Sequence, residues 1–214
     1  MIDVNKREVV RYLGYRGISE PDEALDKMID NCIAEMKKEV SPRYIYRVFP
    51  IDWDDGCEFA GIKVSSGNLP NNLRGCSEIV MMAVTLGPAP DMLVRKAEVR
   101  DMMKAYTYQA VGAAMAEAWC DEINDRIAQE AKERGLHARP RFSPGYGDFP
   151  LEVQKDFIKI LEMPKKIGVT LSESLLMTPT KSITAVIGLS EIEMDCHRGG
   201  CEECNLHENC EYSR

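Results

Sequence analysis

The chain has 214 residues, 44% of them hydrophobic, which is enough for one substantial core and predicts one domain with a small appendage. Its formal net charge of -8 argues against a nucleic-acid partner, because nucleic acids attract basic surfaces. The charged N-terminus lacks the apolar stretch of a secretory signal, and the longest apolar run, residues 79–86, is too short to span a bilayer. We therefore expect a cytoplasmic protein without a membrane partner.

The first elements are predicted from caps and periodicity. Residues Ser19 to Asp22 offer an N-cap followed by a proline in the first turn, and the apolar residues after them recur with helical spacing until a helix must end before Ser41. Aromatic and β-branched residues then predict strands at 44–49 and 78–85, the second apolar enough to be buried on both faces, and a short strand at 61–64.

The remaining elements follow a long helical pattern. Residues 91–134 predict two helices or one bent helix, closed by Gly135 as a left-handed C-terminal cap. The pattern then predicts a strand at 138–142, a turn, a helix at 151–161 and a strand at 182–189. Because strands and helices do not alternate regularly, we expect the α+β class: a single domain with an antiparallel twisted sheet flanked by helices.

Residues Arg141 to Pro150 (R-F-S-P-G-Y-G-D-F-P) concentrate unusual turn chemistry between a predicted strand and a predicted helix. Gly145 and Gly147 allow a tight backbone path and the close approach of another molecule. Asp148 suits the cap of the following helix, whose free N–H groups could help to hold an anion. The ordinary alternative is a solvent-facing arginine before a tight turn.

The order R-x-x-P-G-Y, followed by a proline and a helix, resembles the signature of the activation domain of cobalamin-dependent methionine synthase. The resemblance continues in Ala116–Trp119 (A-E-A-W) and in Ile167–Ser174 (I-G-V-T-L-S-E-S), so it covers roughly the second half of the chain, up to Leu189. The first half is similar to a smaller stand-alone branch of this family. After Leu189 the family continues into a segment that contributes a ligand tyrosine, and this chain does not resemble it there.

The resemblance implies the roles of particular residues. Arg141 and the backbone at Ser143 would bind S-adenosylmethionine, with Gly145 in the same turn, and Glu117 would contact the same ligand. Tyr146 would lie against cobalamin, with a catalytic role at the cobalt's upper side or in excluding solvent. The ligand's carboxylate suits a guanidinium, while its ammonium and sulfonium suit a carboxylate.

The implied function is reductive methylation of cob(II)alamin, which reactivates a corrinoid methyltransferase, methionine synthase in the leading hypothesis. The resemblance implies that the cobalamin lies on a partner corrinoid methyltransferase chain, with a low-potential electron donor. The alternative is a non-catalytic metal-binding or redox adaptor for a corrinoid protein of anaerobic one-carbon metabolism.

Four of the eight cysteines crowd into the C-terminus as C-x4-C-x2-C-x5-C. This spacing predicts a metal site in a cysteine-rich tail, residues 191–214, appended to an activation-like domain over residues 1–190. An iron–sulfur cluster is slightly favoured over zinc, and a reduced or adventitiously disulfide-bonded tail is the alternative. The four remaining cysteines are expected in the core. The proposed ligands are Cys196, Cys201, Cys204 and Cys210.

Overall fold

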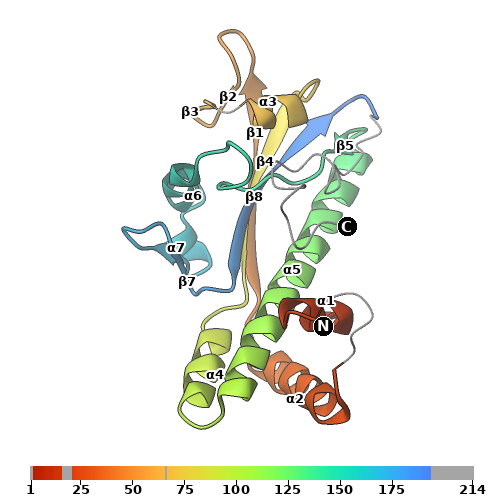
Figure 1. Ribbon diagram of the computed structural model, residues 1–214. Coiled ribbons are helices and arrows are strands. Elements are labelled where there is room, and N and C mark those ends of the chain that lie inside the picture. The colour runs from red at the N-terminus through yellow and green to blue at the C-terminus, as the bar shows by residue number, and fades with distance from the viewer. Residues whose placement is uncertain (1, 16–20, 66, 194–214) are drawn as a thin grey trace. The chain divides into compact units, whose positions relative to one another are not determined.

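A computed structural model describes residues 2–15, 21–65 and 67–193. Six strands form a sheet in the order β3-β2-β1-β4-β8-β5, and β6 and β7 form a separate antiparallel pair (Figure 1). The α+β class with an antiparallel sheet and flanking helices is confirmed. The strands are β1 (Arg43–Asp52), β2 (Glu58–Phe59), β3 (Ile62–Lys63), β4 (Glu78–Thr85), β5 (His137–Ala138), β6 (Thr170–Leu171), β7 (Met177–Thr178) and β8 (Ser182–Ser190).

The chain divides into two compact units. The first comprises residues 1–45, 83–124 and 162–183, and the second comprises residues 46–82, 125–161 and 184–214. In the part of the chain that the structure describes, no helix combines the length and the apolar character needed to cross a bilayer. The helices are α1 (Lys6–Tyr12), α2 (Glu23–Glu39), α3 (Asn68–Asn72), α4 (Ala89–Glu98), α5 (Met102–Glu133), η1 (Leu151–Val153), α6 (Gln154–Ile160) and α7 (Met163–Lys166).

The first unit is built around the N-terminal part of α5. Helices α1, α2 and α4 each contribute buried side chains to the same hydrophobic cluster as this part of α5. Small side chains on α5 permit close packing, since Ala105, Ala110 and Ala114 are at most 4% exposed. Full burial of a large apolar side chain contributes about 1.5–3 kcal/mol, so the fully buried Ile29 and Met36 of α2 are strong anchors.

Helix α2 begins later than the sequence predicts. The carboxylate of Asp22 accepts a 2.8 Å hydrogen bond from the N–H of Leu25, which makes Asp22 the N-cap and Glu23 the first helical residue. Pro21 therefore precedes the cap instead of occupying the first turn, and Ser19 lies outside the described residues.

In the second unit, the predicted burial of β4 on both faces is confirmed for residues 79–82. The N–H of Ile51 donates to the carbonyl of Ser77 at 3.0 Å, and the N–H of Ser77 donates to Leu189 at 3.0 Å, which ties the strands together at this end. The predicted C-terminal cap of α5 is also confirmed. Gly135 has φ +76°, and its N–H donates to the carbonyl of Lys132 at 3.0 Å.

Candidate ligand-binding site

Strand β5 lies at one end of the sheet order and pairs antiparallel with β8. The predicted strand at 138–142 is only partly correct, because regular pairing stops after His137–Ala138. It resumes at Phe142, which exchanges two backbone hydrogen bonds with Val186, of 2.9 and 2.8 Å. Pro140 accounts for the interruption, since proline has no N–H to donate to a ladder.

The interruption is a β-bulge that contains Arg141. On one side of it, the N–H of Arg139 donates to the carbonyl of Gly188 at 2.8 Å, and on the other side lies the bridge from Phe142 to β8. Pro140 and Arg141 together therefore oppose a single residue, Ile187. A bulge bends its strand and redirects side chains, and here the redirected side chain is the half-buried Arg141.

The backbone of Ser143 supplies a donor two residues after this arginine. Because Phe142 turns its N–H and C=O toward β8, the N–H of the next residue points away from β8, at the end of the sheet order. Within the described residues, the N–H of Ser143 makes no hydrogen bond. Its carbonyl accepts from the N–H of Tyr146 at 3.0 Å. An arginine and an unused N–H two residues later form a donor pair suited to a carboxylate.

Three backbone hydrogen bonds hold the turn after Ser143. Besides the bond from Tyr146, the N–H of Phe149 donates to the carbonyl of Tyr146 at 3.1 Å, and the N–H of Gly145 donates to the carbonyl of Phe149 at 2.8 Å. Gly145 has φ +88° and Gly147 has φ +56°, and most side chains disfavour both conformations. The turn is therefore fixed by its own backbone.

The ring of Tyr146 projects from this turn and is 56% exposed. It contacts Phe142 edge to face, with ring centroids 5.3 Å apart and an interplanar angle of 81°. Phe142 contacts in turn the buried Phe149, with centroids 6.2 Å apart. Phe142 was not predicted as a site residue, because it occupies one of the unspecified positions of the motif R-x-x-P-G-Y. Alternation along a strand nevertheless predicts that its side chain and that of Arg141 point to opposite faces.

The chain's own side chains occupy the space beside both glycines. A Cβ at Gly147 would lie 2.8 Å from Nδ2 of Asn68, and one at Gly145 would lie 3.1 Å from Cδ1 of Leu151. At Gly147, packing against Asn68 therefore explains the glycine, instead of the approach of another molecule. The participation of Gly145 in ligand binding stays a prediction.

Asp148 does not cap the helix that follows it. Its carboxylate accepts the N–H of Gly67 at 2.7 Å and the N–H of Asn68 at 3.2 Å, so it caps α3, some eighty residues earlier in the chain. The next helix, η1, has Pro150 at its N-cap position and no side-chain cap. The pairing of Asp148 with Gly67 and Asn68 was not predicted from the sequence, because the rules for helix caps consider only residues close to the helix in the chain.

Glu117 lies on α5, in the first unit, and is half-buried. Two residues later Trp119 donates its indole N–H to the carbonyl of Arg43 at 3.1 Å and contacts Tyr44 edge to face, with centroids 5.9 Å apart. The structure thus places four predicted site residues, at 141, 143, 145 and 146, in one bulge and turn of the second unit, whereas Glu117 belongs to the first.

The predicted metal ligands Cys196, Cys201, Cys204 and Cys210 lie outside the described residues. Between residues 2 and 193, apart from the undescribed gaps, no group of three or more His, Cys, Asp or Glu side chains could hold a metal ion. The other cysteines are buried thiols, as expected for core residues, and burial raises the pKa of two of them, Cys32 and Cys57, to about 11. All four are Cys32, Cys57, Cys76 and Cys120.

Two comparisons with known proteins identify the family and the fold. The family model described as "Vitamin B12 dependent methionine synthase, activation domain" matches residues 70–193, a range that includes Glu117 and the whole turn. The crystal structure of the MetH reactivation domain bound to AdoHcy matches with a TM-score of 0.64 at 16% identity, covering 88% of this chain and 76% of that chain. At this identity the likeness shows a shared fold. Among curated proteins, none matches this chain.

Proposed function

The chain belongs to the family of vitamin B12-dependent methionine synthase activation domains, and on this premise we propose that it binds S-adenosylmethionine and supports the reductive methylation of cob(II)alamin on a partner corrinoid methyltransferase. The observation that carries the proposal is the bulge and turn of the second unit, which sets the guanidinium of Arg141, the unused N–H of Ser143 and the exposed ring of Tyr146 within six residues.

The carboxylate of S-adenosylmethionine is the group that Arg141 and Ser143 would hold. A planar guanidinium binds a carboxylate with two parallel hydrogen bonds, and a backbone N–H adds a third without any loss of side-chain entropy. Gly145, with φ +88°, helps to keep the turn in its conformation. We propose that Glu117 balances the positive charges of the ligand, because the residues around it match the family motif.

Tyr146 is proposed to face the partner's corrin. Its contact with Phe142 fixes the ring while more than half of its surface stays exposed, so it can cover a flat partner without rearranging. Cobalamin on the partner would supply a cobalt centre able to accept one electron from a low-potential donor and the methyl group of S-adenosylmethionine, which would leave as S-adenosylhomocysteine. The chain contributes position and the exclusion of water, which suffice for a methyl transfer between preorganised groups.

Binding is tested by calorimetry with S-adenosylmethionine on wild-type protein, Arg141→Ala and Arg126→Ala. Arg126 is a matched control because it is an arginine of the same unit whose Nε pairs with Glu130 on the surface of α5. Loss of charge-assisted hydrogen bonds predicts an affinity about 10 to 100 times lower for Arg141→Ala, with no change in the control. Absence of binding to wild-type protein, or equal affinity in both variants, contradicts the proposal.

Function is tested by mixing the protein with a candidate corrinoid methyltransferase, a low-potential electron donor and S-adenosylmethionine. Conversion of cob(II)alamin to methylcobalamin is followed by visible absorption. The proposal requires conversion that depends on the protein and on S-adenosylmethionine together. Conversion at the same rate without the protein would show that the chain plays no part in the reaction.

A second candidate function is a metal-binding or redox adaptor for a corrinoid protein, favoured by the four cysteines within fifteen residues of the tail, residues 191–214. We propose an iron–sulfur cluster or zinc at these thiolates, attached to the activation-like domain of residues 1–190. Because the other four cysteines are buried, a thiol reagent added to native protein reports mainly on the tail. Anaerobic analysis of iron, zinc and sulfide identifies the metal. Immediate reaction of the tail thiols before any chelator is added contradicts metal binding.

A further inference from the structure

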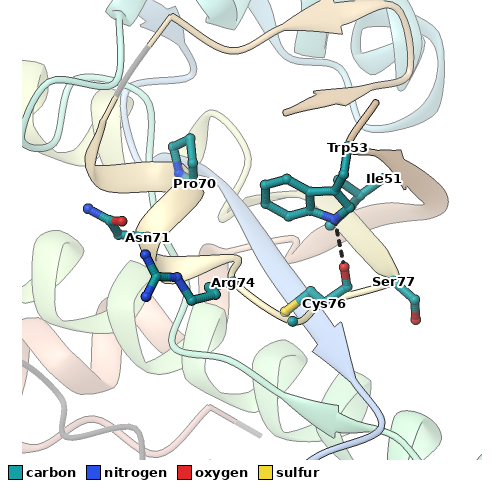
Figure 2. A pocket seen from close by; sticks show the side chains of 8 residues that line it. Ile51, Trp53, Pro70, Asn71, Arg74, Cys76 and Ser77 are labelled. Carbon is teal, nitrogen blue, oxygen red and sulfur yellow. Dashed lines mark hydrogen bonds between the residues drawn. The ribbon is translucent and has the colours of Figure 1, made fainter. Parts of the chain in front are cut away.

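The second unit contains a pocket of about 690 Å³ that includes no residue of the Arg141 turn. Figure 2 shows the indole of Trp53 on one side and Pro70, Asn71 and Arg74 on the other. Its volume lies in the range typical of small-molecule sites, about 300–1,000 Å³. The lining residues are Ile51, Trp53, Pro70, Asn71, Arg74, Gly75, Cys76 and Ser77.

Trp53 offers a fixed aromatic surface. Its indole N–H donates to the carbonyl of Cys76 at 3.0 Å, which sets the orientation of the ring, and 42% of the residue remains exposed (Figure 2). Within the described residues the indole has no aromatic or cationic partner. A large apolar ring held in place and left uncovered is a stacking platform, because a flat ligand can bury it at little cost in conformational entropy.

Arg74 supplies the charge. Among the described residues that line the pocket it alone is charged, and its guanidinium forms no ion pair with any side chain in residues 2–15, 21–65 and 67–193. Of the carboxylates near Trp53 in the chain, that of Asp52 accepts the N–H of Asp54, and that of Asp55 pairs with Lys63. In a protein of net charge -8, such an arginine marks a local preference for an anion.

We propose that this pocket binds an aromatic ring that carries one anionic group, a carboxylate or a phosphate. The ring stacks on the indole of Trp53, and the anion accepts hydrogen bonds from Arg74 and from the amide of Asn71. The pocket is a ligand site separate from the turn that is proposed to hold S-adenosylmethionine.

The test measures the fluorescence of Trp53 in a Trp119→Phe background, which removes the second tryptophan of the chain. Nicotinate and adenosine monophosphate are the two anionic probes, and nicotinamide and adenosine are their uncharged counterparts. We expect a saturable change with at least one anionic probe and an affinity about tenfold lower for its counterpart. Saturation by nicotinate alone identifies a carboxylate ligand, and saturation by adenosine monophosphate alone identifies a phosphate ligand.

Two arginine variants locate the signal. Arg74→Ala should lower the affinity for the anionic probe about tenfold, whereas Arg141→Ala should leave it unchanged. Calorimetry on protein with Trp119 intact repeats the titration without the reporter substitution. The proposal is overturned if neither anionic probe saturates, if the uncharged counterparts bind equally well, or if S-adenosylmethionine displaces the probe and Arg141→Ala abolishes its binding.

Discussion

The turn at Arg141 and the pocket at Trp53 combine the same two groups, an arginine and an exposed aromatic ring, but the chain assembles them differently. In the turn, all the groups lie within ten residues and are held by backbone hydrogen bonds and positive φ angles. In the pocket, Trp53 follows β1 and Arg74 follows α3. The indole N–H of Trp53 donates to the carbonyl of Cys76, two residues after Arg74, and this hydrogen bond joins the two segments. A site made from one short segment is visible in the sequence, whereas one made from separate segments is visible only in the structure.

The two regions are connected through the start of α3. The carboxylate of Asp148, in the turn, accepts N–H groups at Gly67 and Asn68, and the side chain of Asn68 lies against Gly147. The helix that begins at Asn68 carries Pro70 and Asn71 of the pocket. Substitutions at this connection should therefore affect both regions, whereas Arg74→Ala and Arg141→Ala should each affect one.

The largest effect is expected for Gly147→Ala. The residue has φ +56°, and a new Cβ would lie 2.8 Å from Asn68, so the substitution adds a clash to backbone strain. Gly135→Ala is the matched control because Gly135 has φ +76° but nothing within 4 Å of its Cβ. We expect a loss of about 1 kcal/mol in the free energy of unfolding for the control and about 2–3 kcal/mol for Gly147→Ala, measured by urea denaturation. Equal losses would show that Asn68 moves aside freely.

A smaller effect is expected for Asp148→Asn, which keeps the shape of the side chain but removes its charge. The capping bonds to α3 are exposed, so we expect a loss of about 1 kcal/mol in the free energy of unfolding. Affinity for S-adenosylmethionine and for the ligand of the pocket should both fall. Glu152→Gln changes a nearby exposed acid and should leave both affinities unchanged. If Asp148→Asn lowers the affinity for only one of the two ligands, the two regions are not connected in this way.

The features predicted correctly from the sequence are those that depend on neighbouring residues. The apolar run of β4 and the glycine cap of α5 are local, and the structure places both where the pattern does. The bulge at Pro140 was not predicted, although a proline inside a predicted strand cannot complete the ladder. The partner of Asp148 was not foreseeable, because nothing near it in the sequence points to Gly67. Trp53 was not predicted as a site residue for the same reason, because nothing near it in the sequence points to Arg74.

The smallest effect is expected in the first unit, which provides a reference for substitutions that alter stability without touching either ligand. The hydroxyl of the buried Tyr108 donates a hydrogen bond to Glu35, and Lys104 pairs with the same carboxylate at 3.1 Å. The hydrogen bond from Tyr108, followed by that from Lys104, lowers the pKa of Glu35. A carboxylate with a lowered pKa in the folded state stabilises the protein above its unfolded pKa, and this contribution disappears as the pH falls through the folded value.

Tyr108→Phe should remove the larger part of that contribution. Because the Glu35 side chain is 46% exposed and screened by solvent, the loss in the free energy of unfolding at neutral pH should stay below about 1 kcal/mol. The difference between wild type and variant should shrink as the pH falls through the lowered pKa of Glu35 in the folded wild type, because Glu35 is then protonated in both. Urea denaturation at several pH values measures it. A difference in the free energy of unfolding that stays constant with pH would assign the effect of Tyr108 to packing. We expect the affinities for S-adenosylmethionine and for the ligand of the pocket to be unchanged in this variant, which makes it a reference for the substitutions in the turn and the pocket.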